Sequence, residues 1–136
     1  MKIIGITMGD PASIGPEITA KALSDPAVYK RCKPLVVGDA AVMEEALKIT
    51  GLSGKLKIHK IGDVSEALYE YGSIDVYDMG MVDMKELKRG EVSAMAGNAA
   101  FQYVKKVIEL AMDKQVDAPV TNALNKDCLL YTSRCV

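Results

Sequence analysis

Residues 5–17 read Gly-Ile-Thr-Met-Gly-Asp-Pro-Ala-Ser-Ile-Gly-Pro-Glu, and this stretch predicts a strand, a glycine-bearing loop and a helix in direct succession. An apolar run from Ile3 to Ile6 precedes the loop. Pro16 suits a first helical position, because proline has no amide that needs a partner there. Glu17 in the first turn complements the positive end of the helix dipole. Proteins of the α/β class place ligands at strand ends of this kind.

The glycine spacing in this loop carries little information by itself. It does not match the dinucleotide fingerprint, and no Lys-Ser/Thr pair follows, as a phosphate-binding loop requires. Glycine also permits a tight strand-to-helix turn that binds nothing. Both interpretations stay open on spacing alone.

Strand and helix patterns alternate along the rest of the chain. Strands are expected at 2–7, 34–37, 56–61, 74–79 and 116–121, and helices at 16–24, 40–50 and 93–113, with a helical turn near 64–69. Asp25-Pro26 is expected to stop the first helix, and Gly51 to end the second. This alternation predicts a layered α/β fold with a mainly parallel sheet and flanking helices.

The clearest predicted helix is 93–113, which Ser93 suits as the N-cap. Its apolar residues recur at helical spacing and are expected to face the core as one stripe: Ala100, Phe101, Val104, Val107, Ile108 and Ala111.

Composition limits the function classes. The chain has 136 residues, 49% of them apolar, and a net charge of −1, so one domain is expected and binding to nucleic acid or an acidic membrane is not. No apolar run approaches the roughly 20 residues that span a bilayer, and no signal-peptide pattern is present, so the cytoplasm is the expected location. The three cysteines show neither a zinc-site nor a disulfide spacing.

Candidate ligand-binding residues follow two predicted strands. Asp10 sits in the glycine loop, where its carboxylate suits a ligand hydroxyl or a cation; the alternative is that it bonds its own turn amides. Thr121 ends the last predicted strand, where it suits a hydrogen bond to a ligand and the alternative is a structural threonine. Asn125 and Lys126 follow that strand, where a lysine suits phosphate and the alternative is a surface lysine. His59, the only histidine, is expected to be a half-exposed strand residue rather than a metal ligand.

Three segments resemble one enzyme family. Residues 6–18, then Gly90-Glu91-Val92-Ser93 with Gly97 and Ala100, then 120–126 are similar, in order and spacing, to the 4-hydroxythreonine-4-phosphate dehydrogenase family. The resemblance covers residues 1 to about 129. Ser13 stands where the family usually has glycine and would be strained only at positive φ. Asn122-Ala123 stands where the family usually has a small residue followed by proline.

The resemblance implies an enzyme that depends on NAD and a divalent metal (Zn, Mg or Co). Such an enzyme oxidises, then decarboxylates, a small phosphorylated hydroxy acid. It also implies an isocitrate/isopropylmalate dehydrogenase-like fold and a homodimer. The family's metal histidines and nicotinamide contacts lie downstream of the matched region, so no catalytic, cofactor-binding or metal-binding residue is carried onto this chain.

We therefore expect residues 1–128 to be the N-terminal part of such a dehydrogenase, inactive alone. Residues 129–136 are expected to be a non-native end; the alternative is a divergent helix end. The first substrate expected is 4-hydroxythreonine 4-phosphate, used in pyridoxal phosphate biosynthesis. D-Threonate or D-erythronate 4-phosphate is the alternative within the family. A non-catalytic α/β module that binds a phosphorylated metabolite is the alternative from another class.

Overall fold

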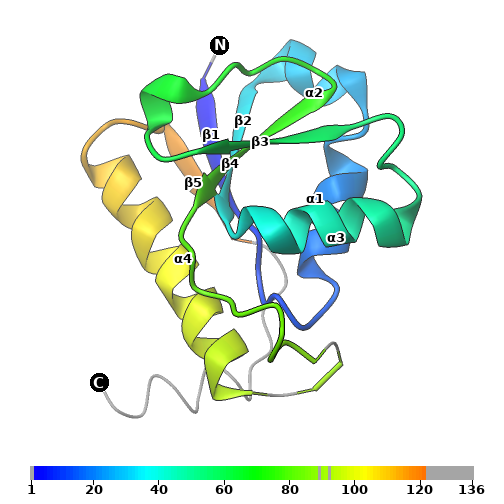
Figure 1. Cartoon of the computed structure of the whole chain (residues 1–136). Coiled ribbons are helices and arrows are strands. Elements are labelled where there is room, and N and C mark those ends of the chain that lie inside the picture. Colours follow the sequence, from blue (N-terminus) through cyan, green and yellow to red (C-terminus); the bar gives the residue numbers. More distant parts are fainter. Residues whose placement is uncertain (1, 89, 92, 122–136) are drawn as a thin grey trace.

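A five-stranded sheet forms the centre of the computed structural model, which describes residues 2–88, 90–91 and 93–121 (Figure 1). The strands are β1 (Ile3–Thr7), β2 (Lys33–Gly38), β3 (Lys57–Ile61), β4 (Ser73–Asp78) and β5 (Ala118–Val120). Their spatial order is β3-β4-β2-β1-β5, and each described neighbouring pair is parallel. The predicted parallel sheet is confirmed.

Helices cover both faces of this sheet. They are α1 (Gly15–Ala22), α2 (Pro26–Arg31), α3 (Ala40–Thr50) and α4 (Ala94–Met112), with a short 3-10 turn at Val64–Glu66. A Cβ added at Gly5 would lie 2.6 Å from Val107 of α4, whereas Ile6 lines a pocket with Ile18 of α1. Because successive strand residues point to opposite faces, α1 and α4 lie on opposite sides of β1 (Figure 1).

Two helix ends follow the predicted chemistry. Helix α3 has the predicted bounds, and Gly51 ends it in the left-handed conformation, at a φ of 75°. Ser93 is the N-cap of α4, and its hydroxyl accepts a hydrogen bond from the Ala96 amide at 3.1 Å.

The interpretation of Asp25-Pro26 as a helix stop was incomplete. Helix α1 ends at Ala22, but a second helix, α2, begins at Pro26. The Asp25 carboxylate accepts a hydrogen bond from the Ala27 amide at 2.9 Å, and Pro26 occupies the first helical position. An aspartate followed by proline is therefore a start signal here.

The predicted core stripe of α4 was partly wrong. The buried residues are Ala96, Gly97, Ala99, Ala100, Tyr103, Val107 and Leu110. Ile108 is 46% exposed, and Phe101, Val104 and Ala111 are half-buried. The apolar arc of the helix is wider than the strip that packs on the sheet. Tyr103 lies in that strip because its hydroxyl has a buried partner, Asp39.

The core lies around β2. Leu35, Val36 and Val37 are fully buried there, and α4 and α2 both contact this strand. Of the helices within the described ranges, none is long and apolar enough to cross a lipid bilayer.

Candidate functional site

The loop that follows β1 turns sharply at its start. Gly9 has a φ of 84°, which favours glycine. The Ser13 amide donates to the Asp10 carbonyl at 3.0 Å, and the Ala12 amide donates to Asp10 Oδ1 at 2.8 Å. Asp10 is 1% exposed. The carboxylate therefore holds its own turn, as the structural alternative for Asp10 expected.

Ser13 adopts this loop without backbone strain. Among the described non-glycine residues, positive φ occurs at Tyr69 and Lys114 alone. A serine at position 13 thus has a φ that any L-residue adopts.

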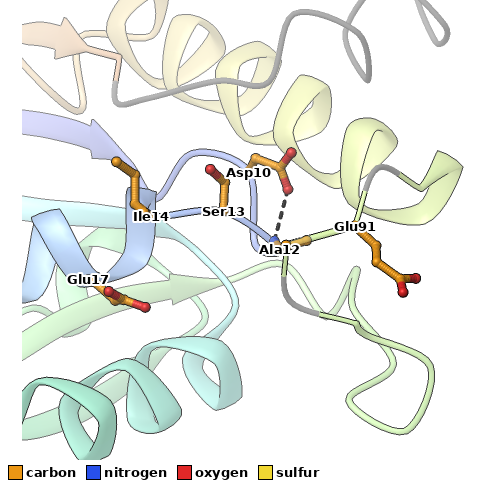
Figure 2. Close-up of a pocket in the computed structure, with 7 residues that line it drawn as sticks. Asp10, Ala12, Ser13, Ile14, Glu17 and Glu91 are labelled. Atoms are coloured by element: carbon orange, nitrogen blue, oxygen red, sulfur yellow. Dashed lines mark hydrogen bonds between the residues drawn. The ribbon is translucent and has the colours of Figure 1, made fainter.

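A pocket of about 240 Å³ opens beside this loop (Figure 2). It is lined by Asp10, Ala12, Ser13, Ile14, Glu17, Gly90 and Glu91. In Figure 2, Glu17 lies on one side of the loop and Glu91 on the other, and the dashed line marks the bond from Ala12 to Asp10. We call it the β1 pocket, because it lies at the carboxyl end of β1, where ligands collect in open parallel sheets.

The far wall of the β1 pocket comes from the segment between β4 and α4. The Gly90 amide donates to the Ala12 carbonyl at 2.7 Å. Gly90 has a φ of 83°, so its conformation also favours glycine. Two segments about 80 residues apart thus meet directly at the pocket.

The predicted site residues are only partly described. Thr121 is exposed and lines a second, mostly apolar pocket of about 220 Å³ with Ile18 and Val120, not the β1 pocket. Strands β1 and β5 are parallel neighbours, with Ile6 opposite Val120, so Asp10 and Thr121 leave the same edge of the sheet. Asn125 and Lys126, like Asn122-Ala123 and residues 129–136, lie outside the described residues.

Sequence reasoning missed Asp39. It lies at the carboxyl end of β2, 3% exposed, and its carboxylate accepts three hydrogen bonds. The donors are the Met81 amide at 3.2 Å, the Val82 amide at 2.8 Å and the Tyr103 hydroxyl at 2.6 Å. Burial, and next the nearby Asp39 carboxylate, raises the pKa of Tyr103. The available signal was position: Gly38-Asp39, like Gly9-Asp10, ends a buried strand.

His59 is confirmed as a half-exposed strand residue. Its side chain is 35% exposed, and Nδ1 lies 2.8 Å from Oδ1 of the fully buried Asp75. The described part of the chain contains no group of three or more His, Cys, Asp or Glu side chains that could hold a metal ion. The β1 pocket has acidic but no basic residues in its described lining, which does not suit a pyrophosphate. The described residues therefore do not fit the implied metal or NAD, and no chemical step is derived through either group.

Solved structures match the whole described fold. One is a 4-hydroxythreonine-4-phosphate dehydrogenase from Burkholderia phymatum, with 47% identity, a TM-score of 0.89, and coverage of 95% of this chain and 38% of that one. Another, also a 4-hydroxythreonine-4-phosphate dehydrogenase, is from Klebsiella pneumoniae. It has 34% identity and a TM-score of 0.88, and the match covers 100% of this chain and 41% of that one. They confirm the α/β class and the isocitrate/isopropylmalate dehydrogenase-like fold.

A curated relative from Symbiobacterium thermophilum is named "Putative D-threonate 4-phosphate dehydrogenase". It is 50% identical over 127 residues, which cover 93% of this chain. The chain spans about 37% of that relative's length. The family model described as pyridoxal phosphate biosynthetic protein PdxA matches residues 30–133, which is more than half of the chain. The chain therefore belongs to the PdxA family of dehydrogenase-like proteins.

Proposed function

We propose that the complete protein is a dehydrogenase that uses NAD and a divalent metal to oxidise, and then decarboxylate, a four-carbon hydroxy acid phosphorylated at its end. Family membership carries this proposal, because the relatives at 47–50% identity are named dehydrogenases of such compounds. The cytoplasm is the proposed location and a homodimer the proposed assembly. In this scheme, parts of the protein outside the described residues hold the metal and the nicotinamide.

The first proposed substrate is D-threonate 4-phosphate. The curated relative with 50% identity has this substrate in its name. The closely related D-erythronate 4-phosphate belongs to the same substrate class. The second candidate is 4-hydroxythreonine 4-phosphate, favoured by the name of the solved structure with 47% identity and by the family description. The two candidates differ in one position of the carbon chain, which has a hydroxyl in one and an amino group in the other.

The β1 pocket supports a role in holding the carbon chain of either substrate. An ionised carboxylate has about four acceptor positions, so Asp10 can accept a substrate hydroxyl while it also accepts the Ala12 amide. We propose that Thr121, Asn125 and Lys126 contact the substrate from the neighbouring strand end, with the Lys126 ammonium at the phosphate. The acidic lining of the β1 pocket disfavours phosphate there, which agrees with this division.

Reduction of NAD by the purified complete protein tests the proposal. The assay supplies a divalent metal and, in separate reactions, D-threonate 4-phosphate and 4-hydroxythreonine 4-phosphate. We expect turnover of D-threonate 4-phosphate with the higher kcat/KM, and none by the 136-residue chain alone. The reverse ranking favours the second candidate. Binding of both compounds without NAD reduction would instead support the non-catalytic module.

A matched pair of lysine variants tests the phosphate contact. Lys126→Ala is expected to raise the KM for the phosphorylated substrate about tenfold or more and to leave the KM for NAD nearly unchanged, since one charged contact is lost. Lys48→Ala, an exposed lysine on α3, is the control and should change neither constant. Equal effects of Lys126→Ala on both constants would contradict a phosphate contact.

A further inference from the structure

The side chain of Asp39 does not make the helix-capping hydrogen bond that its position in the chain predicts. Asp39 is the N-cap residue of α3, and an aspartate there commonly accepts a hydrogen bond from the first turn. Its side chain makes no such bond within the described residues. The Ala40 amide instead donates to Asp78 Oδ1 at 3.0 Å, from the end of β4. The Asp39 carboxylate is therefore directed away from the helix it precedes.

That carboxylate instead holds the segment that leaves β4. Oδ1 accepts the Met81 amide and the Tyr103 hydroxyl, and Oδ2 accepts the Val82 amide. Tyr103 is fully buried and belongs to α4, so the carboxylate joins β2, the 79–91 segment and α4 at one point. The bonds from the Tyr103 hydroxyl and the Val82 amide, at 2.6 and 2.8 Å, are short, and buried hydrogen bonds to a carboxylate are costly to leave unmade.

The segment so held forms the far wall of the β1 pocket. It includes Gly90, whose amide donates to the Ala12 carbonyl at 2.7 Å. The Ala12 amide in turn donates to Asp10 Oδ1 at 2.8 Å. Hydrogen bonds thus link the segment that Asp39 holds to Asp10, which among the described lining residues is the one that is both buried and acidic.

We propose that Asp39 and Tyr103 are positioning residues of the β1 pocket. Their hydrogen bonds fix the described residues of the segment that leaves β4, 79–88 and 90–91, so that the Gly90 amide holds the Asp10 loop in the conformation that receives the substrate. Neither residue lines the pocket. The substrate part of this inference rests on the function proposed above, whereas the part about loop position does not.

Exchange of backbone amide protons in the 136-residue chain tests the loop position. Tyr103→Phe removes only the hydroxyl and keeps the buried ring. We expect the amide of Gly90 to exchange about tenfold faster in this variant, because the wall opens locally, and the core amide of Val36 to be accelerated clearly less. Asp39→Asn should produce the same pattern.

Tyr29→Phe is the matched control. It also removes one phenol hydroxyl, which donates to the Ser73 carbonyl at 3.4 Å, in another part of the fold. It should leave the Gly90 amide unchanged. The inference is overturned if Tyr103→Phe leaves Gly90 unchanged, or if it accelerates Gly90 and Val36 equally, which would indicate a purely structural role.

Steady-state kinetics of the complete protein test the consequence for the substrate. Tyr103→Phe is expected to raise the KM for the phosphorylated hydroxy acid about fivefold or more, with the KM for NAD nearly unchanged. Tyr29→Phe should alter neither KM. A uniform loss of kcat with both KM values unchanged would contradict substrate positioning. If the unaltered protein oxidises no phosphorylated hydroxy acid, the proposed function fails, and the exchange experiment still decides whether Asp39 positions the loop.

Discussion

Two buried carboxylates, Asp39 and Asp75, have similar surroundings in different regions of the sheet. Each is at most 3% exposed, and each accepts hydrogen bonds from two successive backbone amides and from one side chain. For Asp39 the donors are Met81, Val82 and the Tyr103 hydroxyl. For Asp75 they are Leu68, Tyr69 and His59 Nδ1, at 3.2, 2.8 and 2.8 Å.

The two carboxylates differ in what they hold. Asp75 lies within β4 and fixes the 62–72 return loop, where Tyr69 has a φ of 54°. Asp39 lies at the carboxyl end of β2 and fixes a segment that reaches the β1 pocket. Similar local chemistry thus stabilises a loop of the fold at one place and the wall of a pocket at the other. The position along a parallel strand decides which, because ligand sites lie beyond the carboxyl ends.

The largest expected effect is the loss of either carboxylate. Asp39→Ala and Asp75→Ala should each lower the free energy of unfolding by about 3 kcal/mol, because each leaves two backbone amides and one side-chain donor without their acceptor. Urea unfolding measures both. Only Asp39→Ala is expected to shift the NMR amide signals of Gly90 and Ala12.

The control for this pair is Asp63→Ala, which alters an exposed carboxylate and should change stability by less than about 0.5 kcal/mol. If Asp75→Ala shifts the NMR signal of the Ala12 amide as much as Asp39→Ala does, the proposed difference between the two carboxylates is wrong.

Alkaline pH is expected to weaken both regions, and the Asp39 region more. Burial and then Asp39 raise the pKa of Tyr103, and burial and then Asp75 raise the pKa of Tyr29 to about 12. Unfolded tyrosine titrates near pH 10. The stability that these neutral tyrosines contribute is therefore fully present below about pH 10. This contribution is lost as the pH rises toward their pKa values in the folded state.

The pH dependence of urea unfolding separates the two tyrosines. The slope above pH 10 should reach about 1.4 kcal/mol per pH unit for Tyr103 and be smaller for the partly exposed Tyr29. Tyr103→Phe should thus flatten the profile more than Tyr29→Phe does. Equal flattening by both variants would remove this distinction between the regions.

Gly5 packs closely under α4, so a substitution there tests whether the position of α4 holds Tyr103 in place. A Cβ at Gly5 would lie 2.6 Å from Val107 Cγ2 and 3.4 Å from Val116 Cγ2. Gly5→Ala should therefore push α4 from the sheet and lower the free energy of unfolding by about 2 kcal/mol. The Tyr103 ring signals in NMR spectra should shift, and those of His59 should not. Gly54→Ala is the control, since no described heavy atom lies within 4 Å of its added Cβ.

The smallest expected effect concerns Tyr69, beside Asp75. Its hydroxyl oxygen is buried and has no hydrogen-bond partner within the described structure. Tyr69→Phe should therefore leave stability unchanged or raise it by about 0.5 kcal/mol, in contrast to the loss expected for Tyr103→Phe. Thermal unfolding measures both. A clear loss of stability in Tyr69→Phe would show that this hydroxyl has a partner.

Sequence patterns predicted the local parts of the fold well. The bounds of α3, the cap at Gly51, the N-cap at Ser93 and the parallel strands depend on neighbouring residues, and all were recovered. The buried face of α4 was not fully predicted, because the apolar arc of this helix is wider than the part that the sheet covers. Asp10 was found because its turn is local, and its bond to Ala12 spans two residues.

The Asp39 network could not be predicted, because its partners come from distant elements. Met81 and Val82 lie 42 and 43 residues along the chain, and Tyr103 lies 64. No periodicity joins such positions. The run Ile74-Asp75-Val76 did carry a usable signal, since a charged residue in a buried strand requires partners.

The place of β1 in the sheet has a consequence for how the chain folds as it is made. β1 precedes the other four described strands in the chain, yet it lies between β2 and β5. Its contact with β5 closes over 114 residues, where the Ile3 amide donates to Asp117 Oδ2. Because contacts distant in sequence form slowly, one side of β1 stays unpaired while the chain between β1 and β5 is synthesised. Until β5 is synthesised, that unpaired side is open to pairing with a wrong strand or to recognition by a chaperone.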